Sequence, residues 1–465
     1  MFRHRDSIPK PVRHSLRSSV IDGSAYSVMV GLGETYLPAF VLAIGLGEVI
    51  AGLVTTVPML MGAVLQLISP RVIRHTGSHR RWVVLCAAVQ GVAFIPLAIA
   101  AWKGYMPAWS VLAVATVYWG TAMAAGPAWN TWMGHLVPMR LRTRFFTNRT
   151  RFAQGFVMVG LVIGGVTLHI TKLNSEPLLG FVFVFAIACL SRLISSWYLM
   201  RQAEPYCEDF VERTVTAGEM AGRFQGSAGA LMLYMAGVQV TSQLAAPYFT
   251  PFMLQKLEFS YLLYVGMLAT SFFSKSMSMI ILGRVAEKWG ANTLLWIGGL
   301  GIVPLAVMWV VSGSPWYLLP TQVLAGACWG AYELATFLLL FETIPNHERT
   351  SVLTTFNLVN SAAIVTGSIV GGLILRSFDK SVSAYWMIFA LSTVGRALSL
   401  LLLRRVQIDR SAPVPMLIRN LTVRASGGSV DRPILTSIDD ETRSYSRRDL
   451  FADSATSLEA GENGN

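Results

Sequence analysis

The sequence carries little charge for its length. Of its 465 residues only 13% are Asp, Glu, Lys or Arg, whereas 53% are hydrophobic. A soluble domain of this length has nearer to a quarter charged residues, because its surface must face water. The composition therefore excludes an ordinary soluble protein.

Cysteine is also scarce, and recognised catalytic motifs are missing. The four cysteines lie far apart in the chain, with neither metal-ligand spacing nor a disulfide framework. No phosphate-binding loop or nucleophile elbow is present. We therefore expect no metal, no cofactor and no enzymatic activity.

Apolar blocks of about 20 to 28 residues dominate the chain, and each can cross roughly 30 Å of hydrocarbon. Peptide groups find no water there, so each block must be helical. We predict an all-α polytopic membrane protein with about twelve transmembrane helices. The predicted spans are 21–44, 49–70, 82–102, 108–136, 145–171, 178–201, 227–253, 258–283, 293–313, 315–343, 350–376 and 382–404.

The formal net charge of +12 is distributed unevenly between alternate loops. Basic residues gather at 71–81, 140–151 and 284–288, whereas the opposite loops hold few. By the positive-inside rule both termini are cytoplasmic. The positive charge then reflects topology, and we expect a lipid bilayer rather than nucleic acid as its partner.

Polar segments divide the chain into five parts. We predict a basic cytoplasmic N-terminus (1–20), an N-terminal six-helix bundle (21–201), a cytoplasmic central loop (202–226), a C-terminal six-helix bundle (227–405) and a cytoplasmic tail (406–465). The tail should be disordered, because it has no apolar period.

The two predicted bundles repeat one another in sequence. Matches recur in order at an offset that drifts from about 213 to about 204 residues. They pair Tyr36-Leu-Pro38 with Phe249-Thr-Pro251, Trp119-Gly120 with Trp329-Gly330, Gly160/Gly164/Gly165 with Gly367/Gly371/Gly372, and Arg192 with Arg396. Such a repeat predicts two bundles related by an axis along the membrane normal, with a cavity between them. We expect Arg192 and Arg396 to snorkel or to form structural pairs.

The segment Gly283-Arg-Val-Ala-Glu-Lys-Trp-Gly290 resembles the loop pattern of the major facilitator superfamily. The resemblance covers about residues 20–405 and implies that the first and tenth spans line the central cavity. The first-half copy departs from the pattern, with Pro70 for Gly and Arg74 for the acid. Proton-coupled drug antiporters of this superfamily have an Arg in the middle of the fourth span and a Pro within the fifth. Both are missing here, so the resemblance assigns no subfamily.

Three ionisable residues stand out within the predicted spans. Glu34 is about twelve residues into the first span, or ~18 Å deep, and Glu333 lies at similar depth in the tenth. An ionisable group in hydrocarbon costs at least ~2.5–3.5 kcal/mol, so it is seldom without function. Lys275, in the eighth span, is within reach of Glu333. We predict that Glu34, Glu333 and Lys275 couple transport to protons, since desolvation disfavours a charged carboxyl.

Each of these roles has an alternative. Glu34 and Glu333 would also be accommodated as protonated carboxyls hydrogen-bonded to a neighbouring helix. Glu34 would also suit direct binding of a cationic group, and Lys275 either a structural ion pair or an anionic substrate.

Two further groups of residues are candidates. The predicted substrate-binding residues are Tyr36, Asn130, Gln154, Gln239, Gln243, Trp329 and Asn357, for each of which interhelical packing is the alternative. The predicted cytoplasmic gate residues are Arg142, Arg284, Glu287, Lys288 and Arg349, for which topogenic charge is the alternative.

The pattern favours a secondary active transporter that moves a small solute by alternating access, coupled to protons. We expect a monomer in the plasma or inner membrane. The alternatives are an uncoupled facilitator and a transport-inactive receptor or scaffold. Buried charges argue against the scaffold, which has no need of them.

Overall fold

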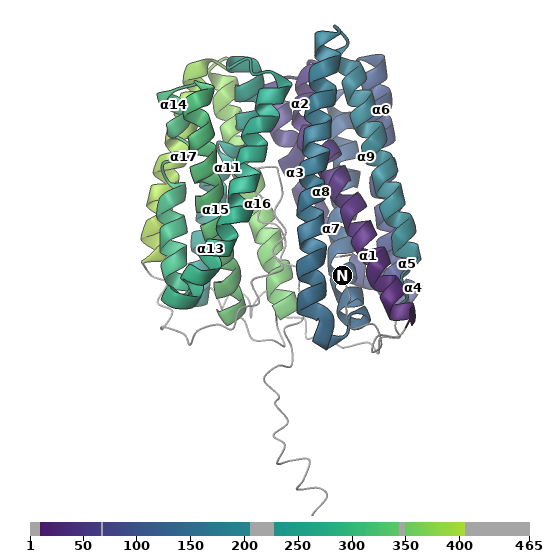
Figure 1. Ribbon diagram of the computed structural model, residues 1–465. Coiled ribbons are helices and arrows are strands. Elements are labelled where there is room, and N and C mark those ends of the chain that lie inside the picture. The colour runs from purple at the N-terminus through teal and green to yellow at the C-terminus, as the bar shows by residue number, and fades with distance from the viewer. Residues whose placement is uncertain (1–9, 67, 205–226, 344–348, 405–465) are drawn as a thin grey trace, which may run out of the picture. The chain divides into compact units, whose positions relative to one another are not determined.

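The computed structural model describes residues 10–66, 68–204, 227–343 and 349–404, and every regular element in these ranges is a helix (Figure 1). The predicted all-α class is confirmed. Residues 1–9, most of the predicted central loop (205–226) and the predicted tail (406–465) lie outside the described residues.

The N-terminal half begins with a helix that changes its winding midway and continues through seven further helices. Its elements are α1 (Lys10–Met29), the π-helix η1 (Val30–Glu34), α2 (Thr35–Ala43), α3 (Glu48–Gln66), α4 (Ser69–Thr76), α5 (His79–Val92), α6 (Phe94–Lys103), α7 (Ala108–Leu136), α8 (Met139–Leu173) and α9 (Pro177–Met200).

The C-terminal half also begins with an interrupted helix. Its elements are α11 (Ser227–Gln243), the 3₁₀-helix η2 (Ala246–Tyr248), α12 (Phe249–Pro251), the π-helix η3 (Phe252–Lys256), α13 (Tyr261–Ile302), α14 (Met308–Val311), α15 (Pro315–Thr343), α16 (Arg349–Ser377) and α17 (Val382–Leu403).

Nine helical segments within the described residues are long and apolar enough to cross a membrane. They correspond to nine of the predicted spans, and the predicted seventh, ninth and tenth spans are also helical. The seventh is divided among α11, η2, α12 and η3. The eighth span and the first part of the ninth form one element, α13, which contains non-helical Gly290 at φ 82°, and the ninth continues in α14.

Local sequence explains where several helices begin and end. The hydroxyl of Ser260 accepts a hydrogen bond from the backbone N–H of Leu263 at the start of α13, and Ser381 does the same for Ala384 in α17. These are N-cap bonds that satisfy an otherwise free donor. Gly104 follows α6 with a positive φ of 72°, as a glycine C-cap does.

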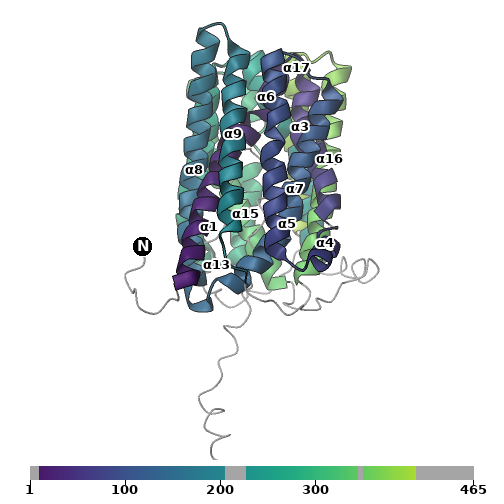
Figure 2. The ribbon, with the colours of Figure 1, turned by 90° about the vertical axis from the view of Figure 1, so that its right-hand side faces the viewer.

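Helix packing brings distant segments together. In Figure 1, α13 and α15 lie side by side, as do α1, α8 and α9. The turned view in Figure 2 shows α3 next to α16, which is a contact between the two halves. Large apolar side chains on other faces are exposed, for example Trp102, Leu173 and Trp316. Such faces suit lipid rather than water.

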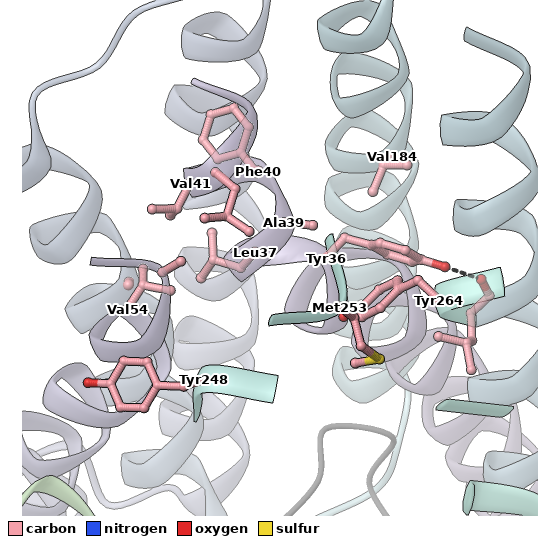
Figure 3. Packing of buried hydrophobic residues seen from close by; sticks show 14 of the residues in the cluster. Tyr36, Leu37, Ala39, Phe40, Val41, Val54, Val184, Tyr248, Met253 and Tyr264 are labelled. Carbon is pink, nitrogen blue, oxygen red and sulfur yellow. Dashed lines mark hydrogen bonds between the residues drawn. The ribbon is translucent and has the colours of Figure 1, made fainter. Parts of the chain in front are cut away.

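A pair of tyrosines shows the sequence repeat in three dimensions. The Tyr36 hydroxyl donates to the backbone carbonyl of Leu161 in α8 (Figure 3), and the Tyr248 hydroxyl donates to that of Ser368 in α16. A Cβ on Gly164 would overlap the Tyr36 ring. The equivalent partner of Tyr36 is therefore Tyr248, one residue from the Phe249 predicted by the sequence match.

The matched glycine runs have the same function in both halves. A Cβ on Gly371 would overlap the Tyr248 ring, as one on Gly164 would overlap Tyr36. Glycine lets α8 and α16 approach the interrupted helices closely. The matched glycines therefore allow close helix packing in both halves.

Candidate functional site

Glu34 lies at the end of the π-helical turn within the first span. Only 2% of its surface is exposed, and its Oε2 accepts a hydrogen bond of 2.9 Å from the Tyr118 hydroxyl of α7. The Tyr118 ring packs edge-to-face on Phe94 and Trp119, with ring centroids 5.3 and 5.6 Å away. A carboxyl group is thus held inside the N-terminal half by a phenol in an aromatic setting.

Proline explains why the helix departs from α geometry at Glu34. Pro38 has no backbone N–H and therefore cannot donate to the Glu34 carbonyl four residues earlier. The backbone N–H and the hydroxyl of Thr35 both bond to the Val30 carbonyl, the hydroxyl at 3.1 Å. Such π-helical turns frequently occur at functional sites.

Glu333 and Lys275 form a close ion pair within the C-terminal half. The Lys275 Nζ lies 2.7 Å from Oε1 and 2.6 Å from Oε2 of Glu333. Lys275 is 8% exposed and Glu333 is 7% exposed. The contact that the sequence predicted between them is confirmed, while its function stays a proposal.

Close helix packing surrounds this ion pair. A Cβ on Gly326 of α15 would overlap the Ser271 carbonyl of α13 and lie 2.8 Å from the Lys275 backbone nitrogen. Glycine therefore brings the backbones of α13 and α15 together one to two turns from Glu333. The pair is almost fully buried, so removing one partner would leave a buried, uncompensated charge.

Sequence analysis missed a second charged cluster, centred on Asp22 of α1. Its Oδ2 lies 3.3 Å from Arg149 Nη2, and its Oδ1 accepts a 2.6 Å hydrogen bond from the Ser195 hydroxyl. Arg192 donates to Ser195 at 2.7 Å and to Gln90 at 2.7 Å. Asp22 was missed because the predicted span started at residue 21, which placed it at the membrane edge.

The two matched arginines are both buried and therefore do not snorkel. Arg192 is 6% exposed and belongs to the Asp22 cluster, so the predicted structural pairing is confirmed. Arg396 is 3% exposed and donates to the Ile302 carbonyl at 2.8 Å, where α13 ends. A cation at a helix C-terminus is stabilised by the helix dipole. Arg396 thus caps a helix that stops before Pro304.

The predicted substrate-binding residues lie in different settings. Gln239 is 1% exposed, and neither polar atom of its side chain has a hydrogen-bond partner among the described residues. Gln243, one turn further on α11, is 4% exposed. Asn130, Gln154 and Trp329 are half-buried, Tyr36 is fully buried with its hydroxyl bonded to α8, and the side chain of Asn357 lies outside the described residues.

The predicted cytoplasmic gate is only partly described. Arg284 and Lys288 of α13 are exposed. The side chains of Arg142, Glu287 and Arg349 lie outside the described residues. The predicted gate therefore stays a prediction. Within the described ranges, no group of three His, Cys, Asp or Glu side chains is placed to hold a metal ion.

Comparisons with known proteins agree with this architecture. Residues 227–438 match the family described as Major Facilitator Superfamily. Multidrug resistance protein MdtL of Salmonella heidelberg is 25% identical over 136 residues, which cover 29% of this chain and 34% of that protein. The match thus spans about a third of the length of these curated relatives.

Solved transporters share the fold. The nucleoside transporter NupG superposes with a TM-score of 0.63 at 10% identity, over 86% of this chain and 100% of that chain. A bacterial homologue of the human lysosomal transporter Spinster gives 0.64 at 14%, over 88% and 100%. A D-xylose-proton symporter gives 0.62 at 14%, over 86% and 98%.

The helices, their repeat and the buried charges define a multi-pass membrane protein with the fold of secondary transporters. Residues 227–438 are thus similar to the Major Facilitator Superfamily, and the solved transporters share the fold over most of the chain.

Proposed function

We propose that the protein is a secondary transporter that moves a small solute by alternating access and couples it to protons through Glu34. Glu333 and Lys275 form a second proton-sensitive site in the other half. The proposal places the protein in the inner membrane with both termini cytoplasmic, in keeping with the distribution of basic residues.

The observation that carries the proposal is the placement of Glu34. Its carboxyl group is buried, it lies where the helix changes winding, and its Oε2 accepts a hydrogen bond from the hydroxyl of Tyr118. A phenol can donate to a carboxylate and can accept from a carboxylic acid. Glu34 is therefore satisfied in both protonation states, as a residue that repeatedly gains and loses a proton must be.

The ion pair of the C-terminal half supports coupling in a different way. Protonation of Glu333 would remove the counter-charge of Lys275 in a nearly dry environment, at a cost of about 3–5 kcal/mol. A state that admits water or solute to Lys275 would avoid this cost. Protonation and a change of conformation would then favour one another.

Gln239 and Gln243 are the best candidates for solute contact. They lie one turn apart, on the same face of α11. The buried side chain of Gln239, which has no hydrogen-bond partner in the described part of the chain, offers both a donor and an acceptor to a ligand. The other predicted substrate-binding residues remain secondary candidates.

Transport by purified protein in liposomes under an imposed pH gradient tests the proposal. A broad panel of solutes, including nucleosides, sugars and drug-like cations, is measured for wild type, Glu34→Gln and Glu176→Gln. Glu176 is an exposed carboxylate of the same half, so its variant is the matched control.

We expect a pH gradient to drive accumulation in wild type and Glu176→Gln but not in Glu34→Gln. Equal accumulation in all three would remove Glu34 from the coupling role. Flux that ignores the gradient would indicate an uncoupled facilitator, and no flux of any solute would favour the scaffold.

A further inference from the structure

A carboxylate at the predicted outer ends of the helices, opposite the predicted cytoplasmic face, joins the two halves. Glu48 is the first residue of α3, and its Oε1 lies 3.0 Å from the Nζ of Lys256 at the end of η3. Its Oε2 accepts a hydrogen bond of 2.6 Å from the hydroxyl of Tyr385 in α17. The acid comes from the N-terminal half and both partners come from the C-terminal half.

These three side chains are well shielded. Glu48 is 5% exposed and Tyr385 is fully buried, while 23% of the Lys256 side chain remains exposed. The ammonium of Lys380 also lies nearby, 3.7 Å from the position of a Cβ on Gly47. The carboxylate thus binds one cation and a phenol at the predicted outer ends of the helices, with a second cation close to the preceding residue.

An aromatic contact between the halves accompanies the charged one. The rings of Tyr36 and Tyr264 meet edge-to-face at 6.3 Å (Figure 3), and those of Phe181 and Tyr261 meet at 6.1 Å. Tyr261 and Tyr264 belong to the first turn of α13, near the predicted outer end. The halves therefore meet at this side through two separate contacts, one aromatic and one charged.

We propose that Glu48, Lys256 and Tyr385 form an outer clamp that must open before the cavity becomes accessible from outside. The apolar burial in the aromatic contact is non-directional and tolerates small rotations. Hydrogen bonds to a buried carboxylate require specific geometry and are lost when the helix ends separate. The outer clamp therefore sets how often the outer side opens.

The test is the reaction of a thiol that the closed state protects. Val265 is 4% exposed, and its side chain lies against Gly165 of the other half. Val265→Cys provides the reporter in every variant, and a membrane-impermeant maleimide is applied to intact cells without any added solute. The chain with Val265 intact, labelled in parallel, gives the background from native cysteines.

Loss of one hydrogen bond to the charged group should raise the open population, and with it the labelling rate, by about tenfold. Glu48→Gln and Tyr385→Phe are the two test variants. Glu176→Gln, an exposed carboxylate of the same half, should label at the parent rate. Exchange of the charges, Glu48→Lys with Lys256→Glu, should restore protection, because the ion pair re-forms.

Labelling of Glu48→Gln and Tyr385→Phe at the parent rate would overturn the outer clamp. So would failure of the charge exchange to slow labelling relative to Glu48→Gln. Tyr385→Phe retains the volume and the ion pair, so it keeps the test decisive if Glu48→Gln does not fold. The outer clamp rests on the proposed alternating access but not on the role of Glu34. Labelling also needs no solute. A failure of the outer clamp can therefore be distinguished from a failure of proton coupling.

Discussion

Replacing both members of the Lys275–Glu333 pair should be far less harmful than replacing one. Both side chains are at least nine-tenths buried within the protein, and Nζ lies within 2.7 Å of both carboxylate oxygens. Lys275→Met or Glu333→Met alone leaves one buried charge without its partner. We expect each to lower the free energy of unfolding by about 3–5 kcal/mol.

The double variant removes both charges and fills the space with apolar atoms. Buried ion pairs replaced in this way are often neutral or stabilising, so we expect its free energy of unfolding to stay within about 1 kcal/mol of the parent. Lys288→Met is the matched control, since Lys288 is exposed on the same helix. Its effect should not exceed about 0.5 kcal/mol.

Unfolding of the four proteins by SDS titration in mixed micelles measures these differences as a double-mutant cycle. The coupling energy should be large and of opposite sign to the single effects. Single effects that add in the double variant, within about 0.5 kcal/mol, would show that the two side chains do not act as a unit.

Three further outcomes follow from the N-terminal half. Tyr118→Phe removes a hydrogen bond to the buried carboxyl group of Glu34, so it should lower the free energy of unfolding by about 1–3 kcal/mol; an unchanged value would contradict this. Gly164→Ala should lower the free energy of unfolding by about 1–3 kcal/mol, because the added methyl overlaps the Tyr36 ring. Gly155→Ala is the control on the same helix, and it should not be destabilising, because open space surrounds Gly155. Tyr36→Phe should lower the free energy of unfolding by about 1 kcal/mol through the lost bond to α8, and a value near zero in the same assay would show that the bond contributes little.

Hydropathy predicted the spans well where the apolar block ends abruptly. The predicted spans 108–136 and 315–343 coincide with α7 and α15, which begin next to Pro107 and at Pro315. The first helix instead begins at Lys10, well before the predicted residue 21. Its early turns carry charges, and Asp22 is stabilised by Arg149 and Ser195 from other helices. A local average of hydropathy contains no information about such distant partners.

The depth of the site residues in the membrane was predictable from the sequence, but the direction in which each helix turns its side chains was not. Helical rise placed Glu333 and Lys275 at compatible heights, and the two do meet. The partner of Glu34 was not predicted, because contact with Tyr118 depends on how α7 turns about its axis and on the π-helical turn before Glu34. Glu48 was overlooked since its position at a span end resembles that of an ordinary surface carboxylate.

The most direct test of the central claim is difference infrared spectroscopy of the carboxyl groups as the pH is changed, which requires no known solute. We predict that wild type and Glu176→Gln gain a band of a buried, protonated carboxyl group as the pH is lowered, and that Glu34→Gln lacks this band. An identical set of bands in all three proteins would show that Glu34 does not exchange protons and would contradict the proposed mechanism.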